Sequence, residues 1–420
     1  MPEHTGTAVQ SSTVVWENLE ETIRQQIQGW LQDLLEEEVT AFLGRARSQR
    51  RDPSAPAGTP PTGYRNGYGK PRHLTTPAGT LTVRRPRVRG LEEQFESRVL
   101  PLFAKRTAAV GELLPQLYLH GLAAGDFDQA LRGLLGEDAP LSPSSILRLK
   151  AKWQQEYDTW RQRSLVDQTV VYLWVDGIYV KAGLEKEKAA LLVAVAALSD
   201  GRKVILAVQA GARESTESWS SLLRDLARRG MNSPRLVIGD GHLGIWGALA
   251  NVYPEAGEQR CWNHRIINVL DRVPKKKQAQ VQVWLREIMY APTREKAVEQ
   301  KGKFQAWCEG QALGEAGRLL EEDWERLVAY YDYPKEHWKH LRTTNPVESP
   351  FAVVRLRTTA AKRYKRVENA TAMIWKLLMV AEKSFRKVNA PELMAPVAAG
   401  ATYINGGRQR GINDGEKIAA

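Results

Sequence analysis

The amino-acid sequence predicts an α/β core that is interrupted by an all-helical insertion and preceded by mostly helical regions. Between residues 166 and 264, apolar runs of strand length alternate with helical patterns, which is typical of an α/β core. Residues 265–340 are charged, carry helical patterns and show no strand signal. An apolar fraction of 43% is sufficient for a hydrophobic core.

The first 105 residues are predicted to form a helix and then a basic arm. Apolar residues at helical spacing from 13 to 44 predict one amphipathic helix within residues 1–50, a possible dimerisation surface. Residues 51–105 are rich in Pro, Gly and Arg, and we expect an arm with short strands, one of which Pro86 ends. Some arginines there fit a phosphate backbone, although a solvated loop fits equally well: Arg65, Arg84, Arg85 and Arg87.

Residues 106–165 predict a helix, a turn at Gly136 and a second helix. Ser142 would cap the second helix and Pro143 would open it. This pattern is a helix-turn-helix candidate, although its long turn fits two ordinary packed helices about as well. The second helix would present three basic side chains to DNA: Arg148, Lys150 and Lys152.

Residues 166–264 predict the first part of the core. The strands are "TVVYLWVDGIYVKAG", "KAALLVAVAALS" and "KVILAVQAG", and "RESTESWSSLLRDLARRG" is an amphipathic helix. The segment "SPRLVIGDGHLGIWGAL" is a strand followed by a Gly-rich turn and a helix, and "EQRCWNH" adds a short fifth strand. The core resumes in residues 341–388 with a helix begun by Asn345. The tail, 389–420, lacks periodicity and is expected to be loosely ordered.

The charge balance favours an anionic partner. The chain has 60 Lys+Arg against 48 Asp+Glu, a net charge of +12 and a pI near 9.6, so DNA or RNA is the simplest partner. Two cysteines exclude a disulfide framework and suit a reducing cytosol. No uncharged apolar run is long enough to span a bilayer, so we expect no membrane partner and a cytoplasmic location.

Three acidic residues, Asp176, Asp240 and Glu348, lie at positions where an acidic side chain calls for an explanation. Asp176 lies inside an apolar strand and Asp240 at the end of another, where charged side chains are rare unless they are paired or bind a metal. The alternatives are an Asp-Gly turn at Asp176 and a helix cap at Asp240. Glu348 has an alternative too, since Asn345 as a cap and Pro346 at the first helical position would make it part of a capping box.

Taken together, Asp176, Asp240 and Glu348 form an oxygen-only set, which hard cations such as Mg²⁺ prefer. Two such ions about 3.5–4 Å apart support phosphoryl transfer. A basic stretch after Glu348 would hold a polyanion, and a solvated basic face is the alternative: Arg355, Arg357, Lys362 and Arg363. Trp246 is a candidate for stacking on an unpaired base, although a core position is the favoured alternative.

At these residues the chain resembles the mutator-type DDE transposases of bacterial insertion sequences. The resemblance covers roughly residues 60–390 and rests on "YRNGYG", "WVDGIYVK", "VIGDGHLGIWGAL", "QRCWNH", "YDYPKEHWKHLRTTNPVES" and "FAVVRLRT". It departs at Pro350 and matches weakly around residues 50–60.

The resemblance implies an RNase H-like core with a helical insertion, in which Asp176, Asp240 and Glu348 are the DDE triad. It also implies binding of terminal inverted repeats and Mg²⁺-dependent cleavage and strand transfer, with Mn²⁺ as a substitute. Pairing two element ends needs at least a dimer, and such an enzyme would work at the bacterial nucleoid. The alternatives are an RNase H-like nuclease without strand transfer and a domesticated, non-catalytic DNA-binding protein.

Cys261 and His264 form a C-x-x-H pair, for which we expect a structural role between the insertion and the core. A zinc site is the alternative, and it would need about four ligands, for which His337 and His340 are the further candidates.

Overall fold

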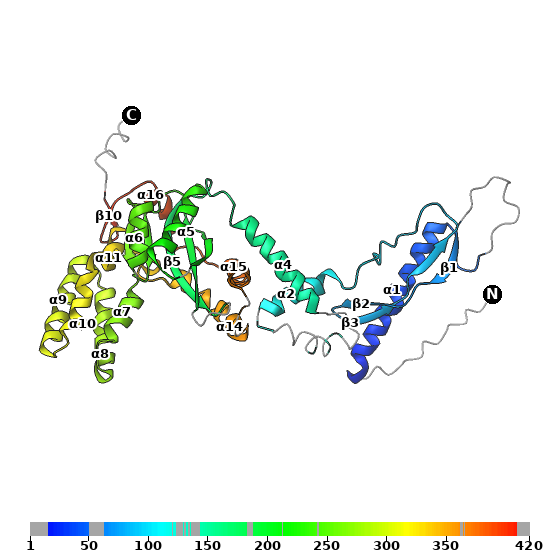
Figure 1. Cartoon of the computed structure of the whole chain (residues 1–420), viewed down its shortest axis with the longest axis horizontal. Helices are drawn as coiled ribbons and strands as arrows, with labels where there is room; N and C mark the ends of the chain where they lie inside the picture. The colour runs from blue at the N-terminus through cyan, green and yellow to red at the C-terminus, as the bar shows by residue number, and fades with distance from the viewer. Residues whose placement is uncertain are drawn as a thin grey trace, which may run out of the picture. The chain divides into compact units, whose positions relative to one another are not determined.

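The computed structural model describes residues 16–49, 63–119, 121–122, 143–182, 188–211, 213–241, 243–361, 364 and 366–409, together with positions 129, 132 and 135. The chain divides into two compact units, Met1–Leu149 and Lys150–Ala420, which are described separately (Figure 1). None of the helices in these ranges is both long and apolar enough to cross a membrane.

The N-terminal unit packs one long helix against short strands. After a 3₁₀ turn, η1 (Trp16–Asn18), helix α1 (Leu19–Leu43) follows the predicted amphipathic pattern and ends at Gly44. Leu35 of α1 is buried with Leu74, Val83 and Leu100 in a small apolar core. Helix α2 (Ala108–Leu119) comes next.

The basic arm contains more regular structure than predicted. It forms β1 (Tyr64–Tyr68), β2 (Arg72–Thr76), β3 (Gly79–Val83) and β4 (Pro86–Arg89), paired as two antiparallel ladders, β1 with β4 and β2 with β3. The prediction that Pro86 ends a strand is wrong in detail: β3 ends at Val83, and Pro86 begins β4. The turn of the predicted helix-turn-helix, with Gly136 and Ser142, lies outside the described residues. The second helix, α4 (Pro143–Trp160), begins at Pro143 as predicted.

The C-terminal unit is built on a mixed five-stranded sheet. Its strands are β5 (Val170–Val180), β6 (Ala189–Leu198), β7 (Lys203–Gly211), β8 (Leu236–Gly239) and β9 (Gly257–Arg260). The order across the sheet is β7-β6-β5-β8-β9. β5, β6 and β7 are antiparallel neighbours, whereas β8 runs parallel to both β5 and β9. The predicted α/β core is therefore confirmed as a mixed sheet with helices.

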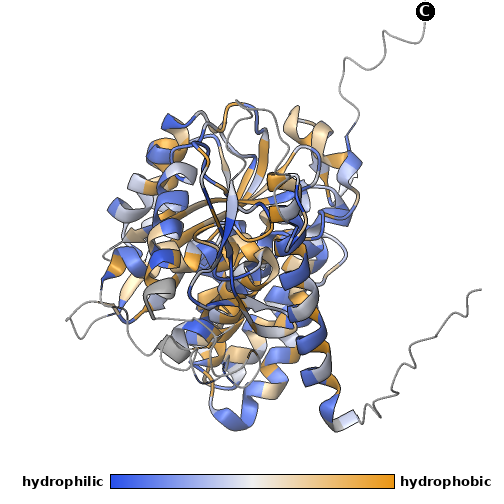
Figure 2. Cartoon of the chain, turned by 90° about the vertical axis from the view of Figure 1, so that its right-hand side faces the viewer, coloured by the Kyte–Doolittle hydropathy of each residue, from blue (hydrophilic) through white to orange (hydrophobic). Residues whose placement is uncertain are grey.

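Helices α5 (Thr216–Arg228) and α6 (Leu243–Val252) bury the apolar residues of one sheet face. Side chains alternate along β5, so Leu173 and Val175 join this core while Tyr172 and Trp174 point to the other face. There, the Tyr172 hydroxyl lies 2.7 Å from Nδ1 of His337. Hydrophilic and hydrophobic residues alternate along the helices of the chain, as Figure 2 shows, which is typical of helices that bury one side.

The segment between the fifth strand and the Glu348 region is helical, as predicted. It comprises α7 (Trp262–Leu270), α8 (Lys275–Met289), α9 (Arg294–Gly310), α10 (Gly314–Glu322), α11 (Trp324–Val328), η2 (Ala329–Asp332), η3 (Lys335–His337) and α12 (Trp338–Leu341). The core then resumes with α13 (Asn345–Glu348), α14 (Phe351–Ala361) and α15 (Val367–Glu382).

The described part of the tail is ordered, contrary to the prediction. It forms η4 (Pro391–Leu393), α16 (Met394–Ala398) and a small ladder of β10 (Tyr403–Ile404) with β11 (Gly407–Arg408). Met394, Val397 and Tyr403 are buried, and α16 packs on β5. A few anchored apolar residues therefore order the segment up to residue 409 without any helical or strand periodicity.

Candidate active site

The parallel pairing of β5 and β8 brings two of the predicted carboxylates together. Trp174 is paired with Ile238 in this ladder, so positions 176 and 240, each two residues farther on, lie at the same level. β5 continues to Val180, so Asp176 is not in the Asp-Gly turn that was the alternative. Asp240 follows β8, where Gly241 has a φ of 99° and turns the chain towards α6.

Glu348 is held at the end of a one-turn helix beside this edge. α13 packs on β5 and β6, and the Thr344 hydroxyl donates a hydrogen bond to the Glu348 carboxylate. Thr344 itself is anchored by its backbone N–H, which donates to Sγ of the buried Cys261 at 3.3 Å. Thr344, and not Asn345, is the N-terminal cap position, so the capping box that was the alternative for Glu348 does not form.

A fourth carboxylate, which the sequence did not single out, belongs to the same edge. Oxygens of Asp176, Asp240 and Glu214 lie within 4.8 Å of one another. A second group of possible ligand atoms at the same spacing consists of Cys261, His264 and Glu348. Glu214 follows an apolar strand closely, as Asp240 does, and this was the one signal that could have revealed it.

The crowded carboxylates shift one another's ionisation. Burial is the main cause that raises the pKa of Asp176 to about 7, and the negative charges of Glu348 and Glu214 raise it further. The Gly177 N–H, 2.8 Å from Oδ1 of Asp176, opposes that shift. The pKa of His264 is raised to about 9 by a hydrogen bond to Cys261 and by nearby negative charges, Glu348 among them. A protonated His264 lies with Nδ1 3.8 Å from Glu348.

Comparisons with known proteins identify the family. The family model described as "Transposase, Mutator family" matches residues 3–387. The chain is 46% identical to the transposase for insertion sequence element IS6120 of Mycolicibacterium smegmatis, over 71% of this chain and 92% of that relative. It is 39% identical to the IST2 transposase of Acidithiobacillus ferrooxidans, over 66% of this chain and 94% of that relative.

The chain belongs to the mutator family of transposases.

Among solved structures, the transposase is similar to a Drosophila P element transposase strand transfer complex, with 10% identity, a TM-score of 0.30, and coverage of 68% of this chain and 83% of the other. The catalytic core domain of HTLV-2 integrase gives a TM-score of 0.17 at 17% identity, over 30% of this chain and 88% of the other. Both TM-scores are low. The α/β assignment of the C-terminal unit therefore rests on its own strand order.

Six of the ten predicted DNA-contact residues that the structure describes are exposed. The exposed ones are Arg84, Arg87, Arg148, Lys150, Lys152 and Arg355. Arg65 is partly buried and ties β1 to α1, since it donates to Oγ1 of Thr40 at 2.7 Å. Arg85 donates to the Phe95 carbonyl at 2.9 Å. Lys362 and Arg363 lie outside the described residues.

Two predicted contacts are buried, which conflicts with a direct role in binding DNA. Trp246 is 4% exposed and packs in the core beneath the sheet, which is the alternative weighed for it. Arg357 is 3% exposed on α14, because its position on that helix turns it inward beside Val354 and Phe351. We therefore drop both as DNA contacts.

The four-ligand zinc alternative is not assembled in the described part of the chain. Cys261 and His264 approach Glu348, while His337 and His340 have other partners. His337 is bonded to Tyr172, and Nε2 of His340 lies 3.1 Å from the Asn389 side chain. These two histidines join the end of the insertion to the sheet and to the tail.

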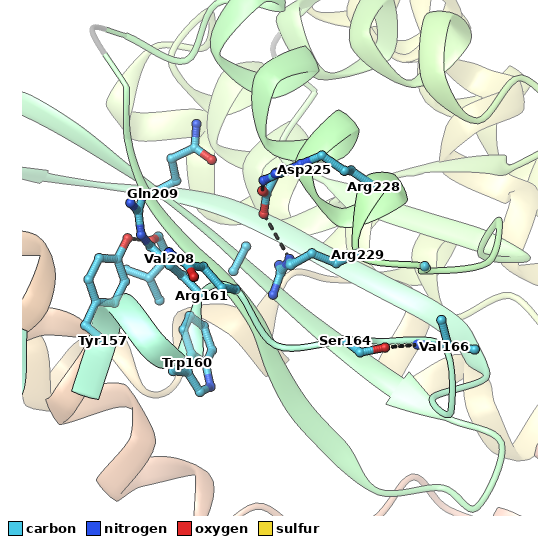
Figure 3. Close-up of a pocket in the computed structure, with 13 residues that line it drawn as sticks. Tyr157, Trp160, Arg161, Ser164, Val166, Val208, Gln209, Asp225, Arg228 and Arg229 are labelled. Carbon is cyan, nitrogen blue, oxygen red and sulfur yellow. Dashed lines mark hydrogen bonds and ion pairs between the residues drawn. The ribbon is translucent and has the colours of Figure 1, made fainter. Parts of the chain in front are cut away.

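A separate cavity of about 830 Å³ lies between α4, β7 and α5 (Figure 3). Two of its three arginines share one carboxylate: Asp225 pairs with Arg228 at 2.5 Å and with Arg229 at 2.9 Å. None of the four clustered carboxylates lines it. We assign it no ligand.

Proposed function

We propose that this transposase binds the terminal inverted repeats of an insertion sequence and catalyses Mg²⁺-dependent DNA cleavage and strand transfer. In this proposal the mixed sheet is an RNase H-like core, and Asp176, Asp240 and Glu348 hold two ions, with Mn²⁺ able to substitute. The observation that carries it is the β5–β8 register, which puts Asp240 level with Asp176.

The donor set fits a hard cation. Asp176 and Asp240 offer only carboxylate oxygens. Burial, and after it the negative charges of Glu348 and Glu214, raise the pKa of Asp176, and a bound cation would favour its ionised form. When bound, Mg²⁺ supplies charge stabilisation at the scissile phosphate. The protein residues would orient the phosphate so that a water, and later a 3′-hydroxyl, attacks phosphorus in line.

The N-terminal unit supplies a surface suited to the DNA backbone. A hollow of about 550 Å³ there has no acidic side chain among the described residues that line it. Its basic lining consists of Lys70, Arg72, Arg85, Arg87 and Arg89. Such a surface binds phosphates without reading sequence. At least a dimer would be needed to pair two element ends, and the enzyme would act at the bacterial nucleoid.

The test is cleavage and joining of labelled DNA that carries the element's own ends, with Mg²⁺ and with EDTA. Glu348→Gln keeps the size of the side chain and removes its charge. We expect wild type to cut and join only with Mg²⁺, and Glu348→Gln to bind DNA but do neither.

The other outcomes separate the alternatives. Cutting without joining by wild type would indicate a nuclease, and DNA binding without cutting would indicate a domesticated DNA-binding protein. A Glu348→Gln variant that cuts as fast as wild type would remove Glu348 from the ligand set.

A further inference from the structure

Glu214 stands at a position that the fold defines tightly. It directly precedes Ser215, whose hydroxyl accepts a hydrogen bond from the Ser218 N–H at 3.2 Å and caps α5. A Cβ on Gly244 of α6 would lie 2.6 Å from the Glu214 carbonyl oxygen, so the two helices meet without intervening side chains. The backbone of Glu214 is therefore fixed by the packing of α5 on α6, next to the turn that carries Asp240.

The Glu214 side chain occupies the space that is open because Gly177 has no side chain. A Cβ on Gly177 of β5 would overlap the Glu214 carboxylate. Gly177 is the residue after Asp176, so this gap lets the Glu214 carboxylate reach the level of Asp176. Any larger residue at 177 would push that carboxylate away.

A hydroxyl further orients the carboxylate. Tyr179 lies two residues beyond Gly177 on the same face of β5 and is hydrogen-bonded to Glu214; burial and then this bond raise the pKa of Tyr179. Carboxylates that ligate metals are themselves commonly held by such hydrogen bonds. The result is a carboxylate aimed at Asp176 and Asp240, with ligand atoms within 4.8 Å.

Glu348 is placed differently. Its carboxylate is engaged by the Thr344 hydroxyl and stands beside His264, in the second group of possible ligand atoms. Both Glu348 and Glu214 act electrostatically on Asp176, so Asp176 is shared by two carboxylate environments.

We propose that Glu214 is a fourth metal ligand of the transposase, which completes with Asp176 and Asp240 the site of one ion, while Glu348 completes the site of the other. This inference rests on the proposed function, since it concerns the same ions. It changes the expected ligand set from three carboxylates to four, and the added carboxylate comes from the "RESTES" segment that opens α5.

The experiment is Mn²⁺ binding to the full-length protein without DNA, measured by electron paramagnetic resonance and calorimetry. We expect Glu214→Gln to weaken the tighter Mn²⁺ site about tenfold or more, which is at least the loss caused by changing an outer-shell partner. Glu217→Gln removes an exposed carboxylate three residues on, in the first turn of the same helix, and should bind Mn²⁺ as wild type does.

A second variant keeps every carboxylate in the chain. Gly177→Ala should displace only the flexible end of the Glu214 side chain, so the protein should fold while its Mn²⁺ affinity falls as in Glu214→Gln. If either variant, shown by circular dichroism to be folded, titrates Mn²⁺ like wild type, the fourth-ligand proposal is overturned.

Failure of the proposed function would look different. In that case Asp176→Asn would bind Mn²⁺ as well as wild type, or wild type itself would neither bind the ion nor cut DNA. Wild-type cleavage together with unaltered Mn²⁺ binding by Glu214→Gln would overturn the fourth ligand alone.

Discussion

Thr344 illustrates how a single hydroxyl can set the geometry of a carboxylate. It is completely buried, its backbone is anchored on Cys261, and its hydroxyl lies within reach of both the Cys261 sulfur and the Glu348 carboxylate. The hydroxyl has one proton to give, and the charged carboxylate is the stronger acceptor. Thr344 is therefore a positioning residue for Glu348. Cys261 of the C-x-x-H segment holds the Thr344 backbone in place, and the Thr344 hydroxyl holds the carboxylate.

Replacing Thr344 by Val keeps the shape and removes the hydroxyl. We expect DNA cleavage to slow about 10- to 100-fold, the range found when an outer-shell partner is lost. Thr344→Ser, which restores the hydroxyl, should recover most of the rate. The measurement is the single-turnover cleavage rate at saturating DNA and Mg²⁺. Equal rates for the Val and Ser variants would show that the hydroxyl does not position Glu348.

The sequence predicted the site residues unevenly, for physical reasons. An Asp within or just after an apolar strand stands out, because burying a charge is costly, and this made Asp176 and Asp240 visible. Glu214 did not stand out, since an acid near the start of an amphipathic helix is ordinary and stabilising there. Its role depends on the absent side chain of Gly177 and on the packing of α5 on α6, neither of which has a local sequence signature.

Among the elements, a largely buried acid joins the helical segment after β9 to the edge of the sheet that carries the clustered carboxylates. Asp323, between α10 and α11, pairs with Arg260 at the end of β9 and with Arg265 of α7. The Arg265 side chain is 2% exposed, so its charge has few alternatives to this partner. A Cβ on Gly241 would overlap the Arg260 side chain, so the ion network packs directly against the turn that follows Asp240.

Asp323→Asn should therefore destabilise the protein by about 3–5 kcal/mol, because it removes the carboxylate that pairs directly with two buried guanidinium groups and leaves them only more distant acids. Chemical denaturation, followed by tryptophan fluorescence, measures the loss. Glu322→Gln is the matched control: Glu322 lies 3.8 Å from Arg265 but is 62% exposed, so its loss should cost less than about 1 kcal/mol. Similar values for the two variants would contradict a structural role for the Asp323 network.

The elements themselves were predictable where periodicity is strong. The strands of the core and the helices of the insertion follow apolar patterns that a single burial direction imposes. The strands between residues 63 and 89 were only partly predicted, because four- and five-residue strands among Pro and Gly leave little alternation to detect. The tail up to residue 409 was wrongly expected to be loose, because Met394, Val397 and Tyr403 anchor it through tertiary contacts that no local pattern reveals.

For the whole molecule, the proposed pairing of two element ends needs a second copy of the chain, and we expect α1 to supply the surface for it. Leu35 and Val39 face the small core of the N-terminal unit. A different face of α1 exposes Ile23 (43%) and Trp30 (63%), and Trp16 of the preceding turn η1 is 84% exposed. They recur every seven residues, which is the repeat of helices that pair as coiled coils.

The double substitution Ile23→Ser and Trp30→Ser should therefore convert a dimer into monomers, measured by analytical ultracentrifugation at micromolar concentration. Because it leaves the basic hollow and the carboxylates intact, the variant should still bind one DNA end while losing the complex that holds two. Val283→Ser, which removes a 56% exposed apolar side chain from α8, should leave the dimer intact. A double variant that sediments as a dimer would move the interface away from α1. The dimer would then have to form through another surface, and strand joining by the variant would persist.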